Sequence, residues 1–308
     1  MEITSLQFRE VEMGFINWLK TLNYSEETIK TRKQNIREFL LYLEQCGVSD
    51  VWSMNDEQVR NFAEYLKRRE NRRDGSGLMN ATINVYIGSA NKFFEYLQQT
   101  GNPAPNSLKQ LEENYRPKNI LTMNEIRQLY ETTYQNHHRL NVTLQTKLEG
   151  IPQRDRAMLS IYYGCGLRKS EGVNLKIDDI LIERKLIHVR KGKGSKERYV
   201  PITGNNLKYI TDYLHHGRNI LLQDNTIDNF FINQYGAACG GMSLSIRLHT
   251  LVKNSGNSVL QSKQPTLHTL RHSIATHLLQ QGMEIELIQK FLGHSSLDTT
   301  QIYTHLIN

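Results

Sequence analysis

Four short segments in the C-terminal part of the chain combine basic, imidazole and phenol side chains in patterns suited to phosphate chemistry. They are YGCGLRKSEGVNL (163–175), VRKGKGSKERYVP (189–201), HTLRHSIATHLL (268–279) and LGHSSLDTTQIYTH (292–305). Arginine presents a planar fork of donors that matches phosphate oxygens, and histidine exchanges protons near neutral pH. A tyrosine hydroxyl can act as a nucleophile when a neighbouring group activates it.

His268 and Arg271 are three positions apart on a predicted helix, so they share one face. A guanidinium beside an imidazole can hold a phosphate and move a proton, although such a pair can also be an ordinary feature of a helix surface. His268 and His272 have the spacing of zinc ligands. The glutamate of an HExxH motif is absent, however, and no cysteine lies close by. We therefore expect no metal and no other cofactor.

Arg168 follows two glycines, Gly164 and Gly166, that allow the backbone to approach another surface closely. They would present Arg168 at the start of a helix, where the alternative is a solvated arginine. Glu171, three residues further on, is expected to be a structural partner for nearby donors rather than a catalyst.

Lys193 lies between two glycines at the tip of a predicted hairpin, from which it could swing into a site or remain a solvated turn residue. The strip around it is basic, which makes contact with phosphate a reasonable expectation. Its basic neighbours are Lys191, Lys196 and Arg198.

Tyr303 lies on a short predicted helix that Ser296 could cap. Taken alone, a tyrosine more often packs in a core or on a surface. His294 follows a glycine that should end the preceding helix, and taken alone it would be a loop histidine.

The elements that must position these groups begin with a helical region. Apolar residues recur at helical spacing in four stretches of the first hundred residues, which predicts a compact four-helix bundle. Ser25, followed by two glutamates, has the character of an N-cap, and Gly47 and Gly101 fall where helices should stop. The repeats are Val11, Phe15, Trp18 and Leu22; Ile29, Ile36, Leu40 and Leu43; Val59, Phe62 and Leu66; and Ile83, Ile87, Ala90, Phe94 and Leu97.

The composition changes after the bundle, where three of the six prolines occur and apolar periodicity is weak. We predict a first domain over 1–101, a linker over 102–118 and a second domain over 119–308. Thr122 and Glu125 form a capping box that opens the first helix of the second domain.

The second domain combines helices with a small β-sheet, so the predicted fold is mainly α with a minor β component. Residues 186–202 read as strand, glycine turn and strand, and 229–233 could be another short strand. Gly282 and Gly293 should end two of the helices. The predicted helices cover 123–134, 153–163, 203–217, 243–254, 267–281, 284–292 and 297–305.

The composition favours a polyanionic partner and a location in the cytoplasm. The formal net charge is +7, and residues 1–101 carry 13 Lys and Arg against 14 Asp and Glu, so the positive excess lies in the second part of the chain. Three scattered cysteines, Cys46, Cys165 and Cys239, indicate reduced thiols and a cytoplasmic setting. We expect no secretion signal, and no stretch approaches the roughly 20 apolar residues of a membrane span.

Together and in this order, the four segments resemble the tyrosine recombinase family, which includes phage integrases and Xer recombinases. The family pattern is an arginine, a hairpin lysine, His-x-x-Arg, a histidine, and a tyrosine nine residues later. The resemblance covers the whole second domain, as a catalytic domain, and more loosely the first, as a core-binding domain. The matching residues are Arg168, Lys193, His268, Arg271, His294 and Tyr303.

The resemblance implies an enzyme that cleaves and rejoins DNA through a 3′-phosphotyrosyl intermediate, without metal or ATP. Because the phenol pKa is about 10, a base or a positive pocket must help the nucleophile ionise. The implied roles are charge neutralisation by Arg168 and Arg271, proton exchange by His268, protonation of the leaving 5′-oxygen by Lys193, a hydrogen bond to the phosphate from His294, and attack by Tyr303.

Double-stranded DNA is the implied partner, with a dimer on each site and a tetramer in the synapse. The run KRRENRR (67–73) could instead be a solvated helix end. The candidate DNA contacts are Lys30, Arg32, Lys33, Lys67, Arg68, Arg69, Arg72 and Arg73 in the first domain, and Lys191, Lys196, Arg198 and Arg247 in the second.

Two other functions stay open at this point. One is an architectural or regulatory DNA-binding protein on the same scaffold that never cuts, and the other is an enzyme that only relaxes or resolves DNA ends. The presence of all six residue types argues against the first. Only five residues follow Tyr303, which puts in doubt the exchange of a C-terminal helix between protomers. Integration, excision and dimer resolution are not separated.

Overall fold

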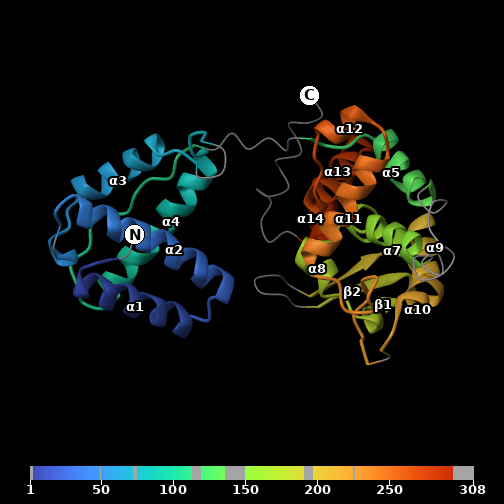
Figure 1. The fold of residues 1–308 in the computed structure, drawn as a ribbon, viewed down its shortest axis with the longest axis horizontal. Helices are drawn as coiled ribbons and strands as arrows, with labels where there is room; N and C mark the ends of the chain where they lie inside the picture. Colours follow the sequence, from blue (N-terminus) through green and yellow to red (C-terminus); the bar gives the residue numbers. More distant parts are fainter. Residues whose placement is uncertain are drawn as a thin grey trace. The chain divides into compact units, whose positions relative to one another are not determined.

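A computed structural model describes residues 3–48, 50–71, 75–112, 119–135, 150–190, 197–224 and 226–293. The chain divides into two compact units, Met1–Asn114 and Tyr115–Asn308 (Figure 1). Each unit has its own hydrophobic core.

The first unit contains the four predicted helices, α1 (Leu6–Thr21), α2 (Glu26–Gln45), α3 (Asp56–Arg68) and α4 (Asn80–Gln99), with a 3-10 turn at Val51–Ser53. Their apolar faces meet in a core rich in aromatic rings. Ser25 accepts a hydrogen bond from the Thr28 backbone and caps α2, as predicted. Gly47 and Gly101 both have positive φ angles, at 78° and 77°, which confirms the predicted helix ends. The largest rings of this core are those of Phe8, Phe15, Phe39, Phe62, Phe93 and Phe94.

The described part of the predicted linker, residues 102–112, packs along the first unit. The backbone amide of Leu108 donates to Asn91 Oδ1 at 2.7 Å, and that of Leu111 donates to Asn84 Oδ1 at 2.8 Å. The side chains of Leu108 and Leu111 also pack against the core of this unit. Side-chain amides of α4 thus replace the backbone partners that an extended segment lacks.

The second unit is mainly helical, as predicted. Thr122 and Glu125 form the expected capping box at the start of its first helix, with hydrogen bonds of 2.7 and 3.2 Å. Its helices are α5 (Met123–Gln135), α7 (Gly150–Leu159), α8 (Lys169–Val173), α9 (Asn205–Asp212), α10 (Arg218–Leu221), α11 (Gly241–Asn254), α12 (Ser258–Ser262), α13 (Leu267–Gln280) and α14 (Ile285–Leu292), with π-helical turns at Ser160–Gly164 and Tyr213–Gly217 and a 3-10 turn at Ile177–Asp179.

A small antiparallel sheet in the order β1-β2-β3 lies at the edge of this helical body (Figure 1). It consists of β1 (Ile180–Leu181), β2 (Leu186–Val189) and β3 (Arg198–Pro201), and Val189 pairs with Arg198. The two strands of the predicted hairpin are therefore confirmed, and β1 was missed because two residues give no periodicity. The predicted strand at 229–233 is wrong, since that segment forms only isolated bridges.

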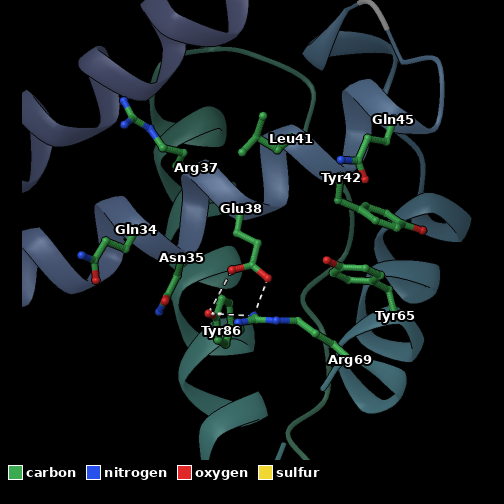
Figure 2. Close-up of a pocket in the computed structure, with 10 residues that line it drawn as sticks. All are labelled: Gln34, Asn35, Arg37, Glu38, Leu41, Tyr42, Gln45, Tyr65, Arg69 and Tyr86. Atoms are coloured by element: carbon green, nitrogen blue, oxygen red, sulfur yellow. Dashed lines mark hydrogen bonds and ion pairs between the residues drawn. The ribbon is translucent and has the colours of Figure 1, made fainter. Parts of the chain in front are cut away.

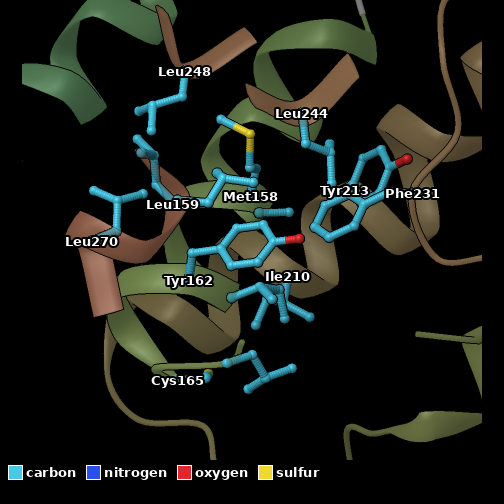
Figure 3. Close-up of a cluster of buried hydrophobic side chains, with 14 of the residues drawn as sticks. Met158, Leu159, Tyr162, Cys165, Ile210, Tyr213, Phe231, Leu244, Leu248 and Leu270 are labelled. Atoms are coloured by element: carbon cyan, nitrogen blue, oxygen red, sulfur yellow. The ribbon is translucent and has the colours of Figure 1, made fainter. Parts of the chain in front are cut away.

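The apolar run at 229–233 serves the core instead. Phe230 and Phe231 are fully buried, and Tyr213 packs against both rings, at centroid distances of 5.2 and 6.0 Å. Tyr162 lies in the same cluster, among side chains from several helices (Figure 3). This core holds the π-helical turn that leads into α8. It therefore fixes the place where Arg168 leaves the helical body.

Among the described residues, no helix combines the length and the apolarity needed to cross a lipid bilayer. The three cysteines are free, with Cys46 exposed and Cys165 and Cys239 buried. Burial raises the pKa of the Cys165 thiol to about 12, so this thiol is un-ionised at neutral pH.

Candidate active site

Arg168 immediately precedes α8, and three hydrogen bonds fix its position. Its Nη1 donates to Glu171 Oε1 at 2.8 Å, and its Nη2 donates to the carbonyl of Gly293 at 2.6 Å. Its backbone amide donates to Glu171 Oε2 at 2.7 Å. The side chain is still 31% exposed, so part of it remains open to solvent.

Arg271 reaches the same place from α13, although it is far from Arg168 in the sequence. Its Nη1 donates to the carbonyl of Gly166 at 2.6 Å, and its Nη2 donates to the carbonyl of Leu292 at 2.8 Å. Arg168 and Arg271 thus hold two consecutive carbonyls, those of Gly293 and Leu292. The structure therefore brings the two predicted arginines together, at the end of α14.

The glycines before α8 allow this close approach, as the sequence indicated. Gly166 has a φ of 61°, and a Cβ on it would lie 2.9 Å from Leu292 Cδ2. Gly293 ends α14 with a φ of 69°, which confirms the predicted helix end. Any larger residue at Gly166 would push α14 away from Arg271.

Glu171 is the carboxylate that links the arginines. Arg198 on β3 binds it with two hydrogen bonds, of 2.9 and 3.0 Å, and Arg271 Nη1 lies 3.9 Å from its Oε2. Burial on its own would raise the pKa of this carboxyl, but the hydrogen bonds and charge of Arg198 and the hydrogen bonds of Arg168 lower it to about 2. Glu171 is therefore ionised at any working pH and acts as a structural partner, as expected.

Arg198 requires a correction. We expected it to contact DNA phosphate, but its side chain is only 10% exposed and both terminal nitrogens are bound to Glu171. The sequence showed a basic strip and gave no sign of the buried carboxylate that neutralises this arginine. Within the second unit, Arg198 therefore serves as the counter-ion of Glu171.

His268 and His272 lie on successive turns of α13, with ring centroids 5.0 Å apart in an edge-on arrangement. Desolvation lowers the pKa of His268, and the charges of Arg271 and Arg168 lower it further. Desolvation and the neighbouring His268 and Arg271 lower the pKa of His272 to about 4. Both rings are therefore neutral at pH 7, and His268 has the protonation state that a general base requires.

The remaining chemistry-bearing residues fall outside the described parts of the chain. Lys193, Lys191 and Lys196 lie in the segment between Arg190 and Glu197, and His294 and Tyr303 follow Gly293. Arg72 and Arg73 also lie outside. In the parts that are described, no cluster of three or more His, Cys, Asp or Glu side chains could hold a metal ion.

Several other predicted DNA contacts have partners within the protein. Arg247 makes three hydrogen bonds to the buried Asp155, the shortest 2.5 Å, while its side chain is 28% exposed, so its contact with the major groove stays a prediction. Arg69 binds Glu38 and Tyr86, and Arg32 donates to the carbonyl of Gly88 at 2.9 Å. Four predicted contacts are exposed at the surface, namely Lys30, Lys33, Lys67 and Arg68. The ammonium of Lys67 also pairs with Glu64.

A groove of about 730 Å³ in the first unit runs beside Arg69 (Figure 2). Tyr86 Oη donates to the second oxygen of Glu38 at 3.1 Å, so Arg69, Glu38 and Tyr86, which all line the groove, form a closed network. Tyr42 and Tyr65 form an aromatic wall, with ring centroids 5.1 Å apart. The sequence predicted only the DNA contact of Arg69 here, and that arginine is paired with Glu38.

Comparison with known proteins agrees with this geometry. The Phage integrase family matches residues 119–308, and the family described as Phage integrase, N-terminal SAM-like domain matches residues 14–101. The chain is 30% identical over 287 residues to Tyrosine recombinase XerD of Oceanobacillus iheyensis, covering 92% of this chain and 88% of that protein. It is 31% identical over 298 residues to Tyrosine recombinase XerC of the same organism, covering 95% and 90%.

Solved structures share the fold. A crystal structure of the XerH site-specific recombinase bound to difH substrate has a TM-score of 0.66 and 24% identity, covering 90% of this chain and 75% of that one. The Tn1549 transposon integrase in complex with transposon right end DNA has a TM-score of 0.71 and 19% identity, covering 95% and 94%. At these identities the likeness establishes the architecture alone.

Proposed function

This chain belongs to the phage integrase family and is a tyrosine recombinase, and from that premise we propose that it cleaves and rejoins DNA at a specific site with Tyr303 as its nucleophile. The single observation that supports this most strongly is the convergence of Arg168 and Arg271 on consecutive carbonyls at the end of α14. The chain passes from there directly to His294. Two guanidiniums held at this point of the chain supply the positive charge that an attack on phosphate requires.

The reaction begins with attack of the Tyr303 oxygen on the scissile phosphorus. His268 accepts the phenol proton, which its lowered pKa permits at neutral pH. The bond between phosphorus and the 5′-oxygen breaks, and Lys193 supplies the proton that this oxygen needs. The products are a 3′-phosphotyrosyl link and a free 5′-hydroxyl. The new link conserves the phosphodiester bond energy, so the reverse attack by a 5′-hydroxyl rejoins the strand.

The arginines lower the barrier of both steps. A pentavalent phosphorane carries more negative charge on its non-bridging oxygens than the diester does. The side chain of Arg168 is 31% exposed, whereas that of Arg271 is 3% exposed and contributes mainly through its charge and the position of α14. His294 would add a hydrogen bond to the same oxygens. Double-stranded DNA is the proposed partner, with a dimer on each site and a tetramer in the synapse.

The test is a covalent trap. DNA bound by the full chain is selected from random duplexes, and the selected duplex is nicked so that a cleaved strand loses its 5′-hydroxyl fragment and cannot be rejoined. The protein is then denatured in detergent and run on a gel. We expect a protein–DNA adduct that Tyr303→Phe abolishes while duplex binding remains. Binding without any adduct on the selected sites would show a protein that never cuts.

A further inference from the structure

Arg198 connects the strand that follows the hairpin to the arginine pair of the candidate active site. We propose that Arg198 is a positioning residue for cleavage, which shares the neutralisation of Glu171 and so keeps part of the Arg168 charge available to the phosphate. This inference rests on the proposed function. The family pattern of six catalytic residues does not include Arg198.

The hydrogen bonds to Glu171 alternate between the two arginines. Oε1 accepts from Arg198 Nη1 at 2.9 Å and from Arg168 Nη1 at 2.8 Å. Oε2 accepts from Arg198 Nη2 at 3.0 Å and from the Arg168 backbone amide at 2.7 Å. The bidentate pair with Arg198 sets the plane of the carboxylate, because two parallel bonds allow one orientation. That plane in turn sets the direction of the Arg168 guanidinium.

Exposure divides the roles of the two arginines. The side chain of Arg198 is 10% exposed and that of Glu171 is 6% exposed, whereas that of Arg168 is 31% exposed. Only Arg168 can therefore reach a ligand. A buried carboxylate that loses a counter-ion draws the remaining cations towards itself. Without Arg198, Arg168 would become the main counter-ion of Glu171. The positive charge of Arg168 would then be neutralised by this carboxylate and would no longer be available to a phosphate.

Arg198 also lies against the turn that ends α14. A Cβ on Gly293 would lie 2.6 Å from Arg198 Nε, and the Gly293 carbonyl accepts from Arg168. Arg198 starts β3, where it pairs with Val189, so the sheet holds its backbone. The guanidinium therefore contacts the carboxylate and the end of α14, and it is linked to the exposed Arg168 through Glu171.

The experiment compares cleavage rates on two nicked duplexes of the selected site. One has an ordinary scissile phosphate, and the other has a methylphosphonate, which carries no negative charge there. A residue that works by neutralising the phosphate matters on the first substrate and much less on the second. The variants are Arg198→Gln and Arg198→Lys. The matched control is Arg190→Ala, since Arg190 also flanks the hairpin and binds a buried carboxylate, that of Asp179, but its side chain is 60% exposed.

With the ordinary phosphate, we expect Arg198→Gln to slow adduct formation about tenfold to a hundredfold, as large as the effect of removing the partner of a metal ligand at a metal site, with duplex affinity unchanged. Its deficit should shrink to about threefold or less on the methylphosphonate. Arg198→Lys should recover part of the rate, because it restores the charge without the bidentate geometry. Arg190→Ala should stay within about twofold of the unmodified protein. An Arg198→Gln rate equal to that of the unmodified protein, or an equal deficit on both substrates, would overturn the proposal.

A second variant separates positioning from stability. The double change Glu171→Gln with Arg198→Gln removes both charges together, which disturbs a fold less than leaving one buried charge alone. Because no carboxylate then captures Arg168, we expect the double variant to cleave faster than Arg198→Gln. A double variant that is as slow as Arg198→Gln, while thermal unfolding shows both to be folded, contradicts the proposal. If the unmodified protein forms no adduct at all, the proposed function fails instead.

Discussion

Each unit of the molecule contains a partly buried pair of arginine and glutamate, but the two sites differ in their balance of charge. In the second unit, Glu171 interacts with three guanidiniums, those of Arg168, Arg198 and Arg271. In the first unit, Glu38 faces one guanidinium, that of Arg69, and a tyrosine hydroxyl. The described contacts thus leave an excess of positive charge at one site and none at the other.

The difference shows what prepares a site for an anion. A balanced pair such as Arg69 and Glu38 has already neutralised its own charges and leaves none for an anion. A site with surplus cations has positive charge that is not neutralised until an anion binds. In the absence of the anion, neutral hydrogen-bond acceptors must hold its arginines in place. The carbonyls of Gly166, Leu292 and Gly293 fulfil that role, because they accept hydrogen bonds without cancelling charge.

The largest expected effect comes from Arg168→Ala, which removes part of the surplus charge. We expect adduct formation to slow by about a hundredfold to a thousandfold, the effect of losing one donor to a developing oxyanion. Arg69→Ala, measured in the same covalent trap at saturating protein, should cleave at close to the unmodified rate. Equal losses for the two variants would show that charge balance does not distinguish the sites.

Acid should weaken the second unit before the first. The unfolded chain protonates His272 near pH 6.5, whereas the folded protein does so only near pH 4. The contribution of this neutral histidine to stability is therefore complete above pH 6.5 and is lost as the pH falls towards 4. The loss is at most about 3 kcal/mol. The first unit, Met1–Asn114, contains no histidine and should not share this response.

Hydrogen–deuterium exchange between pH 7 and pH 5, corrected for the intrinsic rate, measures both units in one sample. Protection should fall in α13 and its neighbours and remain in α2 and α4. His272→Gln should reduce the fall. A uniform loss of protection over both units would contradict the assignment to His272.

Arg69→Ala tests the balanced site on its own terms. The change leaves Glu38 with Tyr86 as its partner and removes a guanidinium that is 15% exposed. We expect the free energy of unfolding to fall by about 1–3 kcal/mol. Urea unfolding followed by circular dichroism gives this value, and a change below about 0.5 kcal/mol would mean that the pair contributes little.

The smallest effect should come from Glu38→Gln combined with Arg69→Gln. Removing both charges leaves no buried ion alone, so the cost in stability should be less than about 1 kcal/mol. The double variant should therefore be more stable than Arg69→Ala in the same urea experiment. If the double variant is less stable, the attraction between the two charges itself stabilises the packing of α2 and α4 against the end of α3.

The sequence predicted the parts of the site that depend on local pattern. The spacing of His268 and Arg271, the glycines before Arg168 and the role of Glu171 all follow from residues a few positions apart. The partners of Arg198 and Arg247 could not be predicted, since their carboxylates lie 27 and 92 positions away. From its charge alone, an arginine that is available to bind DNA looks the same as one that is already paired with a carboxylate of the protein.

The same limit explains the outcome at Phe230 and Phe231. A short apolar run bounded by polar residues has the same pattern whether it forms a strand or fills a core. Its place was decided by Tyr213, more than ten positions earlier, whose ring packs against both. Long amphipathic helices carry their own periodic signal, and for that reason the four helices of the first unit were predictable, although the 3-10 turn at Val51–Ser53 was not.

Arg168 and Arg271 donate hydrogen bonds to the carbonyls of Gly293 and Leu292. A bound phosphate would therefore compete with these carbonyls for the same guanidinium donors. A phosphate that engages Arg168 changes how firmly its Nη2 can grip the Gly293 carbonyl. By reciprocity, anything that loosens the end of α14 alters affinity for the phosphate by an equal free energy. Binding of a phosphate to Arg168 and the attachment of the end of α14 are thus thermodynamically linked, so that each changes the free energy of the other.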